Sequence, residues 1–203
     1  MDEQATVFLN GEGDAWHHRN SHKPRHSVIL DAVMDAGISP THAVEFGCGQ
    51  GFNIAEIAHT FRCRCHGVDP SDAAIAAGRE QYSPDVTFTK GTASYRFLAP
   101  HAFDLVIYGF CLYLCDRDSL HNVVGVGDRA LADHGYLAIQ DFDPEYSHKI
   151  PYHHAPGLFS YKMDHSKLWL SNPAYSLVSK HVYADGEAVW LLKKDVAAGW
   201  PSL

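Results

Sequence analysis

No stretch of this sequence is apolar enough to cross a membrane as a helix. The longest uncharged apolar run, from Leu105 to Cys115, is about 11 residues, and a spanning helix needs about 20. The first residues, Met1-Asp2-Glu3-Gln4, are acidic, whereas a secretory leader begins with basic residues and continues into an apolar core. We therefore expect no membrane contact and no targeting segment.

Basic residues and cysteines are also few. Lys and Arg number 16 against 24 Asp and Glu, which leaves a net charge of −8. A surface of that sign repels phosphate backbones, so nucleic acid is not an expected partner. The five cysteines are an odd number and lack the spacing of four tetrahedral ligands. This predicts reduced thiols, a cytoplasmic location and no bound metal.

The sequence also lacks internal repeats, low-complexity tracts and linkers rich in Gly, Pro or Ser. Its 203 residues, 46% of them hydrophobic, suit one domain with a sizeable core. We divide this domain into an N-terminal arm (1–24), a core (25–141), a covering insertion (142–174) and a C-terminal hairpin (175–193). The arm is polar and aromatic without clear periodicity.

Short apolar runs alternate with stretches of helical periodicity through the core. The predicted strands are 43–46, 66–68, 86–88, 104–108 and 136–139, and the predicted helices are 28–36, 53–60, 72–81 and 118–132. This alternation is typical of a doubly wound, Rossmann-like α/β fold with helices on both faces of a mostly parallel sheet. Two β-rich runs, 176–183 and 187–193, predict a final hairpin. We therefore expect a seven-stranded sheet with an antiparallel edge strand.

A glycine-rich loop follows the first predicted strand and opens a helix. The segment reads Val44-Glu45-Phe46-Gly47-Cys48-Gly49-Gln50-Gly51. Glycines at these positions let the backbone turn tightly and approach a ligand where a Cβ would intrude. The third glycine of the dinucleotide fingerprint would fall at position 52, which is Phe52. The spacing therefore favours a nucleoside ligand without a pyrophosphate over NAD.

An acidic residue stands at the distance from this loop that a ribose requires. Asp69 ends the second predicted strand about 20 residues after the loop, where a carboxylate in a doubly wound sheet reaches ribose hydroxyls. Taken singly, the loop is compatible with a simple tight turn, and Asp69 with a helix cap before Pro70-Ser71. Their joint spacing in an alternating pattern favours a bound nucleoside.

With these motifs the chain resembles the class I S-adenosylmethionine-dependent methyltransferases over about residues 25–193. Glu45–Gly51 is similar to their first motif, Asp69 to their ribose-binding acid, and Gly91-Thr92-Ala93 to their adenine-contacting turn, although an acid usually stands where Thr92 is. The resemblance implies S-adenosylmethionine as cofactor and S-adenosylhomocysteine as product. The implied cofactor-binding residues in the core are Glu45, Gly47, Gly49, Gly51, Asp69, Pro70, Thr92, Ala93 and Tyr108.

The arm contains a second motif, Gly13-Asp14-Ala15-Trp16-His17-His18-Arg19-Asn20. It resembles a G-D-x-[YW]-x-x-R-N segment of a subset of bacterial methyltransferases, including ones associated with surface-sugar biosynthesis. The resemblance implies that the arm folds over the cofactor. Trp16 would then cover the thioether region and Arg19 would pair with the methionine carboxylate, a contact suited to a guanidinium. The alternative is that Trp16 only packs the arm onto the body.

Methyl transfer demands little acid–base chemistry, because the sulfonium is already an electrophile. Holding the acceptor in line contributes about 7–11 kcal/mol, and a base is needed only if the acceptor loses a proton. The candidate bases are Asp141, at the end of the fifth strand, and His153 and His154 in the insertion; each histidine also has a plain surface interpretation. The candidate acceptor contacts are Tyr113, Tyr152, Tyr161 and Lys162.

The sequence thus predicts an enzyme that methylates a small polar metabolite, such as a sugar or sugar-linked intermediate. An acidic surface and an aromatic, His-rich cover suit an enclosed pocket better than an open platform for macromolecules. Two alternatives stay open: a non-catalytic S-adenosylmethionine-binding regulatory module, and a nicotinamide-dependent oxidoreductase, against which Phe52 argues.

Overall fold

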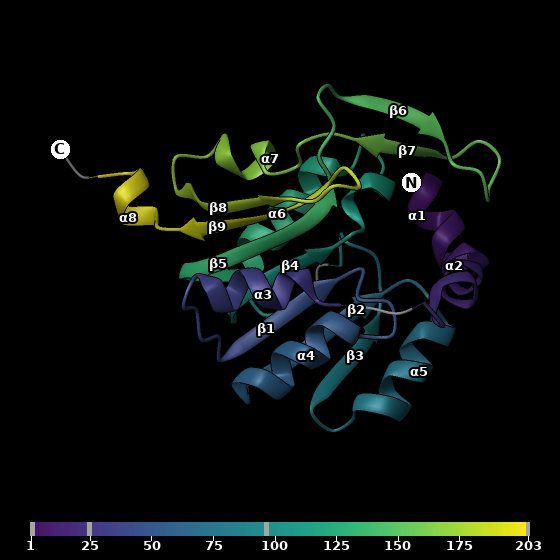
Figure 1. The fold of residues 1–203 in the computed structure, drawn as a ribbon, viewed down its shortest axis with the longest axis horizontal. Coiled ribbons are helices and arrows are strands. Elements are labelled where there is room, and N and C mark those ends of the chain that lie inside the picture. The colour runs from purple at the N-terminus through teal and green to yellow at the C-terminus, as the bar shows by residue number, and fades with distance from the viewer. Residues whose placement is uncertain (1–2, 24–25, 96–97, 202–203) are drawn as a thin grey trace.

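A seven-stranded sheet forms the centre of the computed structural model, which describes residues 3–23, 26–95 and 98–201 (Figure 1). Its strands are β1 (His42–Phe46), β2 (Arg64–Asp69), β3 (Val86–Lys90), β4 (Phe103–Gly109), β5 (Leu131–Phe142), β8 (Tyr175–Val182) and β9 (Glu187–Lys194). The order is β3-β2-β1-β4-β5-β9-β8. The first five strands pair in parallel, β9 runs antiparallel to β5, and β8 is the edge strand, antiparallel to β9. The predicted mostly parallel sheet with antiparallel pairing at one edge is confirmed.

Helices cover both faces of this sheet, as predicted. One face carries α3 (Val28–Asp35), α4 (Phe52–Phe61) and α5 (Asp72–Tyr82), and the other carries α6 (Leu120–Ala130) and α7 (Lys167–Leu170). Successive strand side chains point to opposite faces, so Ala43 belongs to the first core and Val44 to the second. Serine side chains fix two helix starts: Ser27 accepts the N–H of Leu30, and Ser71 accepts that of Ala74.

The boundary between α6 and β5 differs from the sequence prediction. A helix over 118–132 and a strand over 136–139 were expected, but α6 ends at Ala130 and β5 begins at Leu131. Leu131 pairs with Phe103 before the ladder shifts register, and His134 within the irregularity has a positive φ of 62°. Such a bulge interrupts the alternation by which a strand is recognised.

The N-terminal arm is helical, although its sequence showed no periodicity. It consists of α1 (Glu3–Val7), a π-helical turn η1 (Phe8–Glu12) and α2 (Gly13–Asn20). These helices bury only three of their residues, Gln4, Gly13 and His17, and so lack an apolar stripe. The expected end of the arm at residue 24 lies outside the described residues.

The insertion forms a small hairpin of its own, with β6 (His148–Pro151) paired to β7 (Phe159–Lys162). Figure 1 shows this hairpin at the same end of the sheet as the arm. A 3₁₀ turn, η2 (Leu112–Leu114), follows β4, and α8 (Val196–Gly199) follows β9. Among the residues described, no helix combines the length and the apolar character that spanning a bilayer requires.

Two glycines of α6 differ in how closely they approach β4, so replacing each with alanine measures how tightly the helix packs on that strand. A Cβ on Gly127 would lie 2.5 Å from the hydroxyl of buried Tyr108, whereas a Cβ on Gly125 meets no atom within 4 Å. We expect Gly127→Ala to lower the free energy of unfolding by about 1–3 kcal/mol through overpacking. Gly125→Ala should raise it by about 0.5–1 kcal/mol, because alanine is the better helix former. Urea denaturation measures both, and equal effects would contradict the packing described.

Candidate functional site

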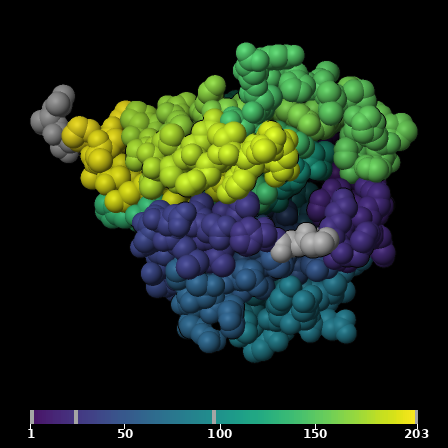
Figure 2. All heavy atoms as spheres, in the orientation of Figure 1, coloured from purple at the N-terminus to yellow at the C-terminus, as the bar shows by residue number. Residues whose placement is uncertain are grey.

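A cleft lies at the carboxyl ends of the parallel strands, between the body and the arm. Its cavity volume is about 120 Å³, and about 820 Å³ when the open space at its mouth is included. Figure 2 shows the hollow beside the purple atoms of the arm. The residues that line it are Ala5, Phe8, Gly13, Trp16, Gly47, Asp69, Pro70, Thr92, Ala93, Ser94, Gly109, Phe110, Cys111, Leu114, Cys115, Asp116, Ser119 and Val123.

The glycine loop forms one wall with bare backbone. The N–H of Gly47 donates to the carbonyl oxygen of Val68 at 2.8 Å, and the residue has a φ of +70°. A Cβ on Gly47 would lie 2.4 Å from the Cβ of Cys111, so only glycine fits there. Gly49 also has a positive φ, and no atom lies within 4 Å of the place where its Cβ would be. Gly49 is itself buried and does not line the cleft, and its N–H is taken by Asp69.

Asp69 connects this loop to the end of β2. Its Oδ2 accepts the N–H of Gly49 at 2.8 Å, and its Oδ1 accepts the N–H of Ser71 at 2.9 Å. Burial raises the pKa of Asp69 to about 6, against the opposing effect of these two hydrogen bonds. Each carboxylate oxygen has a second lone-pair direction, which can accept a ribose hydroxyl. The residue thus fits the expected role.

Glu45 has a different environment from the one expected of a cofactor-binding residue. It is buried and does not line the cleft. Its Oε1 accepts the side-chain amide of Asn53 at 3.0 Å, and its Oε2 accepts the N–H of Ile54 at 3.1 Å. The carboxylate of Glu45 accepts a backbone N–H of the first turn of α4 that has no partner within the helix, and its negative charge stabilises the positive end of the helix dipole.

The structure brings six of the predicted cofactor residues together around the cleft: Trp16, Gly47, Asp69, Pro70, Thr92 and Ala93. Gly49 adjoins them through its hydrogen bond to Asp69. Gly51 lies behind the loop, where a Cβ would meet the ring of Phe88. Tyr108 is fully buried and donates its hydroxyl to the carbonyl oxygen of Val123 at 3.0 Å, which makes it a core residue below the cleft.

Arg19 is occupied by a partner within the arm. Its guanidinium pairs with Glu12 and donates to the hydroxyl of Tyr152 at 3.2 Å. The Tyr152 hydroxyl in turn donates to Glu12 Oε1 at 2.8 Å. These three side chains join α2 to the insertion, and none of them lines the cleft. The pairing of Arg19 with a cofactor carboxylate therefore stays a prediction.

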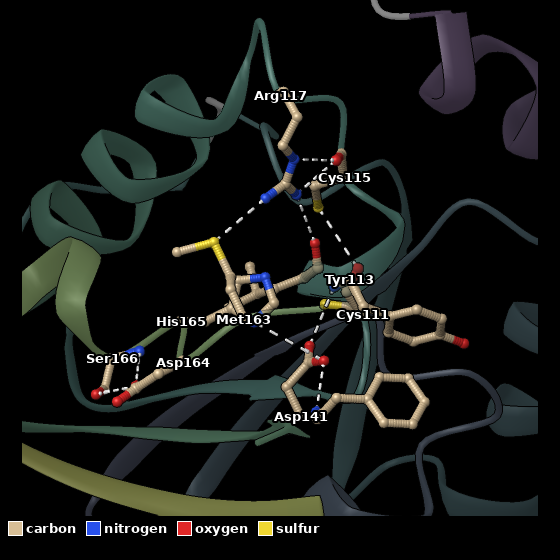
Figure 3. Close-up of polar contacts among 11 residues, drawn as sticks. Cys111, Tyr113, Cys115, Arg117, Asp141, Met163, Asp164, His165 and Ser166 are labelled. Carbon is tan, nitrogen blue, oxygen red and sulfur yellow. Dashed lines mark hydrogen bonds and ion pairs between the residues drawn. The ribbon is translucent and has the colours of Figure 1, made fainter. Parts of the chain in front are cut away.

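The three predicted bases are not brought together. Asp141 is fully buried, with Oδ2 accepting the N–H of Tyr113 at 3.1 Å and Oδ1 accepting that of Phe142 at 2.8 Å (Figure 3). His153 and His154 are exposed on the turn between β6 and β7. All three lie outside the cleft lining. Through its hydrogen bond to the N–H of Tyr113, Asp141 fixes η2, the turn after β4, in place.

A histidine that no sequence motif indicated, His165, lies near Asp141. His165 is fully buried, with Nδ1 3.8 Å from Asp141 Oδ1 (Figure 3). Burial raises the pKa of Asp141 to about 7 and lowers that of His165 to about 3. At about pH 5, between these two pKa values, both groups are therefore mostly uncharged, and 3.8 Å is too long for a hydrogen bond. Only tertiary structure brings together two residues so far apart in sequence.

Arg117 holds the same turn from the opposite side. Its Nη2 donates to the carbonyl oxygens of Leu112 at 3.0 Å and Cys115 at 2.7 Å. Asp141 accepts the N–H of Tyr113 in η2, and the guanidinium of Arg117 donates to the carbonyl oxygen of Leu112 in the same turn (Figure 3). A backbone donor and a backbone acceptor of η2 are therefore each hydrogen-bonded by a side chain. η2 carries Leu114, one of the cleft residues.

The predicted acceptor contacts pack around the cleft rather than line it. Tyr113 is buried between Phe110 and Phe142, with ring centroids 5.0 and 5.1 Å away. The guanidinium of Arg117 lies 4.5 Å from the ring centroid of Tyr161, and Nζ of Lys162 lies 3.5 Å from that of Phe142. With Tyr152 in the arm junction, none of these four contributes to the lining.

The remaining lining residues come from places that sequence analysis did not single out. Ala5 and Phe8 belong to the arm, and Leu114, Cys115 and Asp116 belong to the segment after β4. An apolar Val7-Phe8-Leu9 run in an otherwise polar arm was the one available signal. As to metals, Asp133, His134 and Asp195 bring potential ligand atoms within 4.8 Å of one another, but at the opposite end of the sheet from the cleft.

Comparisons with known proteins agree with this geometry. Residues 43–135 match the family described as a methyltransferase domain. The Burkholderia thailandensis 1,6-didemethyltoxoflavin-N1-methyltransferase, with bound 1,6-didemethyltoxoflavin and S-adenosylhomocysteine, has a TM-score of 0.76 at 14% identity, covering 96% of this chain and 91% of that chain. No curated protein matches this chain.

Two further solved structures share the fold. A chain in the complex of the Haloferax volcanii Trm112 methyltransferase activator with a methyltransferase has a TM-score of 0.74 at 14% identity, covering 92% of this chain and 97% of that chain. An S-adenosylmethionine-dependent methyltransferase from Methanosarcina mazei has a TM-score of 0.65 at 14% identity, covering 81% of this chain and 97% of that chain.

Replacing His165 should change how stability depends on pH. Because the folded-state pKa lies below the unfolded value of about 6.5, the unfolded chain binds the extra proton, and His165 costs stability as the pH falls below 6.5. Asp141, whose pKa is raised by folding, adds stability as the pH falls, but it is present in both wild type and His165→Leu and so drops out of the comparison. Relative to wild type, His165→Leu should therefore gain about 2 kcal/mol between pH 7 and pH 5.

Urea denaturation at the two pH values measures this difference. The matched control is His22→Leu, which removes an exposed histidine and should leave the two profiles parallel. Parallel profiles for His165→Leu as well would show that its imidazole is not held neutral by burial.

Proposed function

We propose that this chain is a class I S-adenosylmethionine-dependent methyltransferase and that it methylates a small molecule held between the arm and the segment after β4. The observation that carries the proposal is the roofed cleft. Its lining joins the cofactor-type residues Gly47 and Asp69 to Phe8 and Trp16 of the arm. An acceptor there is enclosed by the chain's own N-terminus, which leaves no open platform for a macromolecule.

The chemistry of the walls favours an acceptor with an apolar or aromatic body. Ala5, Phe8 and Trp16 come from the arm, while Phe110 and Leu114 come from the segment after β4. Such walls contribute contact area and ring stacking rather than fixed hydrogen bonds. The acceptor named for the Burkholderia relative, 1,6-didemethyltoxoflavin methylated at N1, supports a small-molecule substrate.

A sugar or sugar-linked acceptor, the expectation from the arm motif, has less support in these walls. Sugar hydroxyls require several polar partners, because an unpaired polar group in a closed site is costly. On the arm side the lining offers one carboxylate, Asp116, whose two oxygens each accept one backbone N–H, from Gln4 and Ala5, so it can accept one or two acceptor hydroxyls at most. We therefore favour a largely apolar acceptor over a sugar.

S-adenosylmethionine supplies, when bound, a methyl group on a positively charged sulfur. The residues proposed to hold it are the loop from Gly47 to Gly51 for its main-chain contacts, Asp69 for the ribose, and Thr92 with Ala93 for the adenine. The place of Gly47 in the cleft lining and the spare lone pairs of Asp69 fit these roles. Trp16 closes the cleft from the arm side.

We propose that this chain catalyses transfer by positioning rather than by a side-chain base. Asp141 is engaged by two backbone N–H groups below the cleft, and His153 and His154 lie outside its lining. An acceptor atom that attacks through a lone pair needs no base, and alignment alone can lower the barrier by about 7–11 kcal/mol. The expected cytoplasmic location and one-domain organisation stay predictions.

The test is to supply methyl-labelled S-adenosylmethionine together with a cell extract separated into small-molecule, protein and nucleic-acid fractions. We expect label in the small-molecule fraction, in products with apolar or aromatic character. An Asp69→Ala variant at limiting cofactor serves as the control for background transfer. Label confined to protein or nucleic acid would refute the enclosed-acceptor proposal, and label in sugars would refute the preference for apolar acceptors.

The ribose role of Asp69 can be measured directly by calorimetry with S-adenosylhomocysteine. Loss of a charged hydrogen-bonding partner in Asp69→Ala should weaken binding by about 1–3 kcal/mol, or about 5- to 150-fold. Asp72→Ala is the matched control, because Asp72 is exposed and pairs with Lys90 outside the cleft. Unchanged affinity in a folded Asp69→Ala protein would exclude the assignment.

A further inference from the structure

Besides the junction of Glu12 and Arg19 with Tyr152, two anchors fix the arm to the body, one on each side of Gly11. The first joins α2 to α5: Asp14 Oδ1 accepts the hydroxyl of Ser71 at 2.6 Å and the N–H of Ala73 at 3.0 Å. These hydrogen bonds lower the pKa of Asp14, so the carboxylate is ionised at the positive end of an eleven-residue helix. This anchor is charge-assisted and belongs to the cofactor side of the cleft.

The second anchor joins α1 to the opposite side and depends on Gln4. Gln4 is 3% exposed although it lies near the N-terminus. Its Nε2 donates to the carbonyl oxygen of Leu114 at 2.7 Å, and its Oε1 accepts the N–H of Phe159 at 2.7 Å. The N–H groups of Gln4 and Ala5 donate to the two oxygens of Asp116, each at 3.2 Å. One residue thus ties α1 to η2, β7 and the segment after η2.

A break in the helix lies between the two anchors. Asn10 (φ −98°, ψ 17°) and Gly11 (φ 133°, ψ −22°) are non-helical within η1. A Cβ on Gly11 would meet no atom within 4 Å, so the break is unpacked. Glycine at positive φ is where a chain changes direction at least cost. Rotation at these two residues moves α1 and leaves the Asp14 anchor intact.

Such a rotation would open the cleft, because Ala5 of α1 and Phe8 of η1 form part of its lining. We propose that α1 is a hinged flap with Gln4 as its latch, and that exchange of S-adenosylmethionine for S-adenosylhomocysteine requires this latch to open. The proposal rests on the cofactor occupying this cleft. It assigns to Gln4, a residue outside the cleft lining, the control of how fast the cofactor enters and leaves.

The experiment compares Gln4→Met with wild type in stopped-flow binding of S-adenosylhomocysteine. Methionine preserves the length and volume of the side chain but removes both of its hydrogen bonds. Trp16 is the one tryptophan among the described cleft-lining residues, so its fluorescence reports occupancy, and Trp16→Phe checks the origin of the signal. Gln81→Met on the exposed face of α5 is the matched control.

Loss of two hydrogen bonds of ordinary strength should raise both the association and the dissociation rate constants about tenfold, with Kd changed less than about threefold. Gln81→Met should match wild type. Unchanged rate constants, or a faster dissociation with Kd weakened in proportion, would overturn the latch, since the second result means that Gln4 supports affinity only.

Two further outcomes are distinguishable. If thermal denaturation shows that Gln4→Met does not fold, Asp116→Asn applies the same test from the other side of the contact, with a smaller increase expected in both rate constants. If wild type does not bind S-adenosylhomocysteine at all, the cofactor site itself is refuted, whereas normal wild-type binding with unaltered variant kinetics refutes only the latch.

Discussion

The carboxylate of Asp69 is the contact on which the organisation of the site depends. It accepts the N–H of Gly49 on one oxygen and that of Ser71 on the other, which fixes the glycine loop against the start of α5. Ser71 then accepts the N–H of Ala74 and donates to Asp14 of the arm. A single buried acid thus sets the positions of loop, helix and arm, although burial raises its pKa and opposes its charge.

The opposite side of the cleft is organised around η2 without an ion pair between Asp141 and His165. Asp141 and Arg117 satisfy the N–H and carbonyl groups of this turn, and His165 fills the space beside Asp141 as a neutral ring. Thiols nearby are similarly uncharged: burial raises the pKa of Cys48 and of Cys111. A thiol is a poor nucleophile compared with a thiolate, so these cysteines can lie near a methylating cofactor without reacting with it.

The sequence was sufficient for the features that depend on local pattern. Alternating apolar runs predicted the sheet and its helices, and the spacing of Gly47, Gly49 and Asp69 predicted that these residues lie together, as they do in the structure. Their contact with a cofactor stays a prediction. The features that depend on tertiary contact were not predictable. Gln4 is buried by contacts with Leu114 and Phe159, each more than a hundred residues away in sequence. His165 is buried beside Asp141. Nothing in the sequence around either residue distinguishes it. Asp141 stands where predicted but faces backbone N–H groups rather than the cleft.

The arm combines two requirements that normally conflict, which are enclosure of the reaction and access to it. Its closed position satisfies the N–H of Phe159 and the carbonyl of Leu114 through one neutral amide. When the arm opens, water replaces that amide, so the net cost per hydrogen bond is only about 0.5–1.5 kcal/mol rather than the full penalty of a buried unpaired group. The amide of Gln4 and the carboxylate of Asp116 can both exchange their partners for water, which permits reversible opening at this junction, whereas Asp14 holds the anchor that stays closed.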